Sequence, residues 1–472
     1  MRLSRLDMDD CGTTFLPPRW EASVGEPATT GKLQHGQSAL EDGSYYHLTA
    51  PPLPPRPPLA DSIRAETAIV GGGLAGLATA LSLAERGRDS VLLEGQTIGA
   101  GASGRNGGMV SAGFAASTRV LERAVGPQAA RSLMRLSREA MDLIRWRIAR
   151  YAIACEPVSG VVIASWFDDG AALAAEVAES NRRYGMRLEY WDRARLRRDY
   201  PSPRYWDGMF DPEGFHLDPF ALLRGYAAAA EAMGARLYER TPATSLRRVA
   251  GGWRLATPEG EVIADRVVLC QSAYPPRILR SVARATLPVF TYVIVTAPLS
   301  GAHAEVIRAP YAVYDNRFAT GYYRLLADGR LLWGGRISTR ERPHDLAETM
   351  RRDLALVYPQ LADVGVDYAW SGRMGFARHK MPLIRELAPG LWVNSCFGGH
   401  GLNTTTLGGE LVASALAEDD RRWQLLAPFA PRWVGGALGS FAAQAIYGRA
   451  RLQDAARARW HRQRAARRRD VA

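Results

Sequence analysis

The sequence predicts a mixed α/β (α+β) fold built around a strand, a glycine turn, a helix and a second strand that follow one another near residue 70. Three observations support this prediction. An apolar strand pattern at 65–70 leads into the glycine-rich segment 71–76, and a helix pattern and a strand ending at residue 94 follow it. A second strand that leads into a glycine turn and a helix lies at 391–416. Between these units, helical stretches alternate with β-rich ones.

The length and composition indicate a globular protein. With 472 residues, 47% of them hydrophobic, the chain can bury a large core, and we expect two domains that share intertwined segments. The apolar runs are shorter than the roughly 18 residues that cross a bilayer, and acidic residues stand where a secretory signal has its apolar core. We therefore expect no membrane span and a cytoplasmic location. The four cysteines (Cys11, Cys155, Cys270 and Cys396) lack metal-ligand spacing, so we expect no metal site and buried free thiols.

The first 60 residues form a segment rich in Gly, Ser, Thr and Pro, which we expect to be a partly disordered arm. Within it, the aromatic stretch 44–50 is suited to dock on the body of the protein. Further along, the patterns predict helices at 171–184 and 219–233 and a β-rich stretch at 286–297.

The first glycine turn has the spacing of a dinucleotide site. Gly71 permits a tight turn, Gly73 lets the backbone approach a pyrophosphate, and Gly76 allows the helix to pack closely on the strand. Glu94 ends the next strand, 18 residues after Gly76, where a carboxylate can accept hydrogen bonds from a ribose diol. The expected cofactor contacts are Gly71, Gly73, Leu74, Ala75, Gly76 and Glu94.

The segment 99–108 holds five glycines in ten residues. Such a loop can wrap closely around a flat, phosphorylated cofactor, whereas a flexible linker is the alternative. We expect cofactor contacts from Ser103, Gly104, Arg105, Asn106, Gly107 and Gly108.

The second glycine turn precedes a helix that we expect at 404–416. A helix N-terminus here could point its positive end at the pyrimidine edge of a cofactor such as a flavin and stabilise the anion that forms when hydride arrives. An ordinary glycine-rich helix entry with a structural His400 is the alternative. The expected contacts are Gly398, Gly399, His400, Gly401 and Leu402.

The net charge of +12 is concentrated at the C-terminal end. Residues 448–472 hold nine Arg and two Asp and so supply +7 of it. We interpret this segment as a solvated helix that ends in an arginine run, with a weak contact to an anionic membrane or RNA as the alternative. No nucleic-acid-binding module accompanies it, so we expect no nucleic-acid partner. Lysine occurs only at Lys32 and Lys380, against 58 arginines, which limits the choice of an active-site ammonium.

Together the three glycine motifs resemble the D-amino-acid-oxidase-like FAD-dependent oxidoreductases, and within them most closely the γ-glutamylputrescine oxidases of bacterial polyamine breakdown. The segments 44–50, 207–219, 321–336 and 398–413 and the Met381-Pro382 pair also resemble family segments, in the same order. The glycine motifs are specific to the superfamily, and GYYRL with LLWGGR narrows the resemblance to the γ-glutamylputrescine oxidases within it.

The resemblance implies a Rossmann-like FAD-binding domain assembled from separated segments and an antiparallel-sheet substrate domain that covers the flavin. Among sarcosine-oxidase-like relatives a cysteine can attach FAD covalently, but the matching region here offers no clear candidate, so we expect noncovalent FAD. It divides the chain into an N-terminal arm (1–60), FAD-binding segments (61–155, 211–285 and 381–425), substrate-domain segments (156–210 and 286–380) and a C-terminal helical region with a basic tail (426–472).

The implied reaction is oxidation of the C–N bond of an amine or amino acid to an imine, by hydride transfer to flavin N5. The implied partners are a small-molecule amine or amino acid and oxygen or another electron acceptor. Tyr322, Tyr323 and Trp333 would enclose the amine, and Arg324 or Arg336 would pair with a carboxylate or the flavin. Because side chains alternate along a strand, at least half of these should face the core. Asp315 is another residue that could either line the site or lie in the core, and His400 is a further catalytic candidate.

Three departures from the family pattern bear on the substrate. Gly321 stands where an acidic residue would bind the cationic end of a polyamine, Arg385-Glu386 replaces a glycine, and Cys396 replaces another. The leading hypothesis is an oxidase or dehydrogenase acting on a soluble amine that carries a carboxylate. The alternatives are a D-amino-acid dehydrogenase-like enzyme that reduces a membrane quinone, and a non-catalytic flavoprotein that binds RNA or a partner protein.

Overall fold

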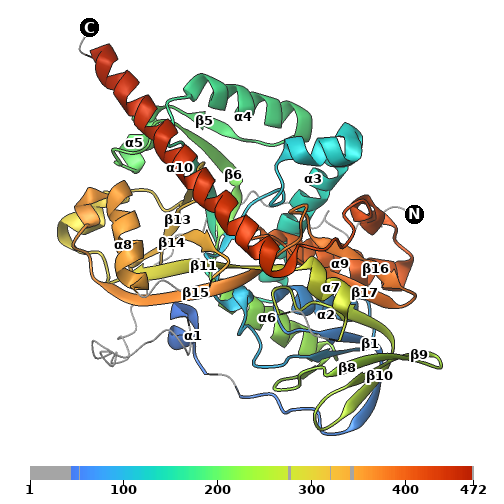
Figure 1. Ribbon diagram of the computed structural model, residues 1–472. Coiled ribbons are helices and arrows are strands. Elements are labelled where there is room, and N and C mark those ends of the chain that lie inside the picture. Colours follow the sequence, from blue (N-terminus) through green and yellow to red (C-terminus); the bar gives the residue numbers. More distant parts are fainter. Residues whose placement is uncertain (1–43, 53, 275–277, 319, 341–344, 470–472) are drawn as a thin grey trace, which may run out of the picture. The chain divides into compact units, whose positions relative to one another are not determined.

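The structure is a computed structural model that describes residues 44–469 except 53, 275–277, 319 and 341–344 (Figure 1). Most of the expected N-terminal arm, Cys11 and Lys32 therefore lie outside the described residues. The α-helices are α1 (Tyr45–Thr49), α2 (Leu74–Ala84), α3 (Thr118–Arg150), α4 (Gly170–Tyr184), α5 (Arg193–Asp199), α6 (Pro219–Ala232), α7 (Arg280–Ala285), α8 (Leu346–Val357), α9 (Gly401–Glu418) and α10 (Gly436–Arg469).

The first sheet has a parallel centre, in which β17, β10, β1, β2 and β7 run side by side. β16 and the β8–β9 hairpin extend it with antiparallel pairs. The parallel strands are separated along the chain, as expected for a nucleotide-binding domain assembled from distant segments. The strands are β1 (Ser62–Val70), β2 (Ser90–Leu93), β7 (Arg236–Tyr238), β8 (Ser245–Val249), β9 (Gly252–Ala256), β10 (Glu261–Leu269), β16 (Leu383–Ala388) and β17 (Leu391–Ser395).

The second sheet is antiparallel except for the parallel pair β4–β12, which confirms the expected sheet type with one exception. β11 pairs with both β14 and β15 in long antiparallel ladders. The strands are β3 (Met109–Val110), β4 (Val158–Ala164), β5 (Glu189–Trp191), β6 (Gly208–His216), β11 (Leu287–Thr296), β12 (Ala312–Asp315), β13 (Tyr322–Leu325), β14 (Leu331–Ser338) and β15 (Val366–Phe376).

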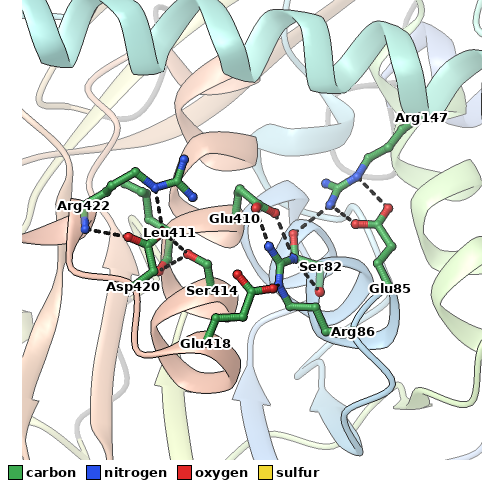
Figure 2. Close-up of polar contacts among 10 residues, drawn as sticks. All are labelled: Ser82, Glu85, Arg86, Arg147, Glu410, Leu411, Ser414, Glu418, Asp420 and Arg422. Carbon is green, nitrogen blue, oxygen red and sulfur yellow. Dashed lines mark hydrogen bonds and ion pairs between the residues drawn. The ribbon is translucent and has the colours of Figure 1, made fainter. Parts of the chain in front are cut away.

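Helices α2 and α9 pack against each other at close range. Every residue of α2 is buried, and a Cβ at Gly409 of α9 would lie 2.6 Å from the backbone of Ala78, so the glycine allows this approach. Ion pairs also join the two helices (Figure 2). Arg86, two residues after the end of α2, binds Glu410 and Glu418 of α9, at 2.5 and 2.9 Å.

A second buried pair joins α2 to α3. Arg147 donates to Glu85 at 2.6 Å and to the hydroxyl of Ser82 at 2.7 Å, and its side chain is inaccessible to solvent. These contacts hold the helices that follow both glycine turns as one layer.

The predicted elements appear with small shifts in their limits. The helix expected at 404–416 begins earlier, at Gly401, because the turn is completed by Gly398 and Gly399, which have φ angles of +64° and +81°. The aromatic stretch at 44–50 contains α1 and docks as expected, since Tyr46 is buried and its hydroxyl donates to the carbonyl of Asn106 at 3.1 Å.

Two further expectations are confirmed for the residues that the structure describes. Cys155, Cys270 and Cys396 are buried and free. The basic C-terminal segment belongs to helix α10. None of the helices in the described ranges has the length and apolar character needed to cross a membrane.

Candidate active site

A cavity of about 890 Å³ is lined by residues of both sheets and by the N-terminal ends of α2 and α9. This volume lies in the range of roughly 300–1,000 Å³ that cofactor and ligand sites occupy. The residues expected from the sequence that line it are Gly71, Gly73, Leu74, Ala75, Glu94, Ser103, Arg105, Asn106, Gly107, Gly108, Tyr322, Arg336, Gly398, Gly399, His400, Gly401 and Leu402.

The first glycine turn has little room for side chains. Gly71 has a φ of +111°, and a Cβ at Gly76 would lie 1.9 Å from the carbonyl oxygen of Gly71. Gly76 therefore lets α2 begin directly against the turn, as the motif predicted, and is not itself part of the cavity lining. The backbone N–H of Leu74 donates to the hydroxyl of Ser103 at 2.9 Å, which joins the turn to the second glycine-rich loop.

Glu94 holds the turn from the side. Its carboxylate accepts the N–H of Gly72 at 2.6 Å and the N–H of Gln96 at 2.8 Å, while burial raises its pKa. Glu94 thus fixes the backbone of the glycine turn, and it lines the cavity beside that turn. A contact with a ribose stays a prediction.

The loop at 99–108 is fixed by its own polar side chains. Asn106 accepts the N–H of Gly108 at 2.9 Å and donates to the carbonyl of Ser103 at 2.9 Å. A Cβ at Gly104 would lie 2.4 Å from the carbonyl oxygen of Gly99, so Gly104 packs within the loop and does not line the cavity. The loop is ordered by these contacts and does not resemble a flexible linker.

The second glycine turn places His400 at the N-cap of α9. The imidazole Nε2 donates to the carbonyl of Ser111 at 3.0 Å, and burial lowers the pKa of this histidine, which keeps it neutral. Because the N-terminal ends of α2 and α9 border the same cavity, both partial positive charges act on its contents.

The alternation expected for β13 is present. Tyr322 lines the cavity, whereas the ring of Tyr323 stacks on Trp333 in the core and its hydroxyl lies 2.6 Å from that of Tyr358. Asp315 is also buried, in an ion pair with Arg317 at 2.6 Å. Tyr322 is therefore the member of this group that contacts the cavity.

The two expected arginines have structural partners. Arg324 does not belong to the cavity lining, because its guanidinium donates to the carbonyl of Gly107 at 2.8 Å and to the hydroxyl of Tyr46 at 3.0 Å. Arg336 does line the cavity, but its charge is paired with Asp353 of α8. The geometry favours neither as a free cation for substrate.

Sequence reasoning missed Arg373 of β15, which lines the cavity. Its guanidinium lies 3.9 Å from the ring centroid of Tyr274, and its Nε is buried without a hydrogen-bond partner. Nothing in the local sequence distinguishes Arg373 from the many other arginines of the chain. Arg105 lies close by, because it too interacts with Tyr274.

The cavity has an excess of positive charge. Arg105, Arg373 and Lys380 line it, and none of them has a carboxylate partner among the described residues. Burial lowers the pKa of Arg105, as expected for a cation without such a partner. Glu94 is the acidic residue of the described lining, and its carboxylate is already bonded to the glycine turn.

A parallel sheet whose glycine turns open two helices onto one cavity is typical of a dinucleotide-binding protein. The chain belongs to the FAD dependent oxidoreductase (DAO) family, whose model matches residues 66–415. FAD is therefore its cofactor, and the resemblance and the cofactor predicted from the sequence are confirmed.

Similar proteins agree with this assignment. The chain is 35% identical over 388 residues to the γ-glutamylputrescine oxidoreductase of Escherichia coli, which covers 81% of this chain and 91% of the relative. It is 34% identical over 376 residues to the probable oxidoreductase OrdL of Haemophilus influenzae, a match that covers 78% of this chain and 86% of the relative. The crystal structure of glycine oxidase from Geobacillus kaustophilus shares the fold, with a TM-score of 0.66 and 23% identity. This match covers 78% of this chain and 98% of the glycine oxidase chain.

The residues present fit FAD. Gly73 lines the cavity, and a Cβ there would lie 2.8 Å from the hydroxyl of Ser103, so the absence of a side chain leaves room for the Ser103 hydroxyl beside the turn. The N-terminal ends of α2 and α9, which border the cavity, would stabilise the negative charge of bound FAD.

Proposed function

We propose that the protein oxidises the C–N bond of an amine or amino acid that carries a carboxylate, giving an imine. The observation that carries the substrate class is the set of cavity cations without carboxylate partners: Arg105, Arg373 and Lys380. Arg105 and Arg373 are partly buried, whereas Lys380 is exposed. A partly buried cation is stabilised by an anionic ligand, whereas a ligand with cationic ends only would be repelled. This favours γ-glutamylputrescine or an amino acid over a free diamine such as putrescine.

The side chains of the cavity bind and enclose the substrate, whereas bound FAD supplies the hydride acceptor. In this proposal Arg105 and Arg373 hold the carboxylate, and Tyr322 and Phe318 cover the amine end and exclude water. The N-terminal end of α9 stabilises negative charge that develops at the pyrimidine edge of the cofactor.

We further propose that FAD is bound noncovalently. Cys270 lines the cavity at the first glycine turn, and burial raises the pKa of its thiol to about 12, which keeps it protonated and unreactive. Acid precipitation of the protein should therefore release all of the flavin into the supernatant. Flavin that stays with the precipitate would contradict noncovalent binding.

The central experiment is an anaerobic panel of amines added to the purified protein, with bleaching of the flavin absorbance as the readout. γ-Glutamylputrescine, N-methyl amino acids and D-amino acids are compared with putrescine and with amino-acid amides, which lack the carboxylate. We expect bleaching by at least one carboxylate-bearing amine and much slower bleaching by its amide. Equal bleaching by acid and amide would contradict the carboxylate site.

Two controls separate this function from its alternatives. Admission of air after bleaching measures peroxide, and slow reoxidation that a quinone accelerates would indicate a dehydrogenase. Bound FAD that no amine reduces would contradict the proposed reaction and favour a non-catalytic flavoprotein.

A further inference from the structure

Helix α10 is fixed to the second sheet along one side. Tyr447 and Ala458 are buried, and the hydroxyl of Tyr447 accepts the N–H of Ile337 of β14 at 3.2 Å. Near the other end, Arg457 binds Asp169 at 2.8 Å. In Figure 1 the helix lies across β11 and β14 as an outer element.

The side of α10 that faces away from the sheet carries several exposed apolar side chains. Leu438 is 80% exposed, Phe441 69%, Leu452 74% and Trp460 52%. At 3.6 residues per turn these four side chains fall within an arc of roughly 100°, opposite the buried Tyr447. Large apolar side chains at such exposure indicate a surface that binds something, because single exposed residues are common but an aligned row is not.

The same helix is strongly basic. It contains nine arginines and a single acidic residue, Asp454. The carboxylate of Asp454 accepts the backbone N–H of Phe318 at 2.8 Å, so it is directed at the body of the protein. Arg449 and Arg459 are exposed on the outward side and have no carboxylate partner among the described residues. The outward surface therefore combines an apolar row with positive charge.

We propose that this outward surface of α10 (Leu438, Phe441, Arg449, Leu452, Arg459 and Trp460) binds the surface of an anionic phospholipid bilayer. The apolar side chains would enter the boundary between headgroups and acyl chains, while the arginines contact lipid phosphates from positions along the same helix. A helix of this kind lies in the plane of the membrane surface and does not cross it.

A second copy of the chain is the competing occupant of this surface, and the charge argues against it. A two-fold contact through α10 would bring two arginine-rich helices together, with Asp454 of each already used, and like charges would repel. An anionic surface instead gains from each arginine, by roughly fivefold in affinity per residue near the headgroups.

The test is sedimentation of the purified FAD-loaded protein with vesicles made of equal parts phosphatidylglycerol and phosphatidylcholine, or of phosphatidylcholine alone. We expect binding to the anionic vesicles, at least tenfold weaker binding to the neutral ones, and weakening by added salt. Binding that is absent, or equal for both vesicle types, would overturn the proposal.

Variants locate the binding surface. A variant with Leu438→Gln, Phe441→Gln and Leu452→Gln should bind anionic vesicles at least tenfold more weakly, with unchanged FAD content and melting temperature, since all three side chains are exposed. Leu356→Gln removes an exposed leucine from α8 and should leave binding unchanged. Equal binding by the triple variant, or a concentration-dependent dimer that the triple variant abolishes while vesicles are ignored, would overturn the assignment.

Discussion

The close contact between Gly76 and the first glycine turn gives the sharpest prediction. In Gly76→Ala the new Cβ would lie 1.9 Å from the carbonyl oxygen of Gly71, against an ordinary contact of at least 3.4 Å. Because the obstructing atom belongs to the backbone, no side chain can rotate away, and the turn and α2 must separate by about 1.5 Å.

The magnitude follows from two opposing effects. Overpacking of this kind costs typically 1–3 kcal/mol, and the contact with Gly71 belongs at the severe end of that range. Alanine is a better helix former than glycine by about 1 kcal/mol, which offsets part of the loss. We expect a net loss of about 2 kcal/mol in unfolding free energy. FAD affinity should fall at least tenfold, or about 1.4 kcal/mol, since the turn no longer fits the pyrophosphate.

The assay is the ratio of flavin to protein absorbance after gel filtration, together with thermal melts with and without added FAD. Gly448→Ala in α10 is the matched control, because a Cβ there would meet no atom within 4 Å. It should keep full FAD and melt at or slightly above the wild-type temperature. If Gly76→Ala also keeps full FAD and wild-type stability, the role of this glycine in helix–turn packing is refuted.

The remaining predictions concern packing, the cavity wall and pH. Arg86→Met should lower the free energy of unfolding by about 2 kcal/mol, a value between those for exposed and buried ion pairs. Glu418→Gln, at the exposed end of the same cluster, should lower it by less than about 0.5 kcal/mol. Urea unfolding measures both changes. Tyr322→Phe should lower kcat/KM by about fivefold with unchanged stability, because Tyr322 lines the cavity. Tyr323→Phe should instead lower the free energy of unfolding by about 1 kcal/mol with unchanged KM, because its hydroxyl bonds to that of Tyr358 in the core. The reverse pattern would show that the strand is oriented the other way. Burial lowers the pKa of His216 to about 4, below its unfolded value near 6.5, so the unfolded state takes up the proton first as the pH falls. The free energy of unfolding should therefore decrease as the pH drops from 6.5 to 4, by at most about 1.4 kcal/mol per pH unit. In thermal melts across this pH range, His216→Gln should flatten the slope.

Features encoded in short stretches of sequence were predictable. The turn at Gly71, Gly73 and Gly76, and the turn before α9, depend on backbone conformations and close approaches that only glycine allows within a few residues. The alternation of Tyr322 and Tyr323 follows from strand geometry alone. For these elements local stereochemistry determines the structure, so the pattern of residue types was sufficient.

The roles of the arginines depend on tertiary partners and were not predictable. Arg336 was a candidate for substrate binding because it belongs to the segment 321–336 that resembles the family, but Asp353, from a separate helix, neutralises it. Arg324 is used to fix the loop at Gly107. Arg373, which has no such partner, lies in a strand with no distinguishing motif. In a chain with 58 arginines, only the three-dimensional structure separates the paired guanidinium groups from the unpaired ones.

The unpaired cations have a further consequence for the proposed reaction. Hydride leaves a carbon beside nitrogen only when that nitrogen carries a lone pair, so the substrate amine must react as its free base. In the proposed reaction Arg105 and Arg373 would oppose a second positive charge in the cavity and so lower the pKa of a bound ammonium group, while they would stabilise the substrate carboxylate. The same positive cavity favours negative charge that arrives at the cofactor during the reaction. Binding of the carboxylate and deprotonation of the amine are thus two effects of one arrangement of charges, and a cavity with an acidic residue in place of these arginines would oppose both.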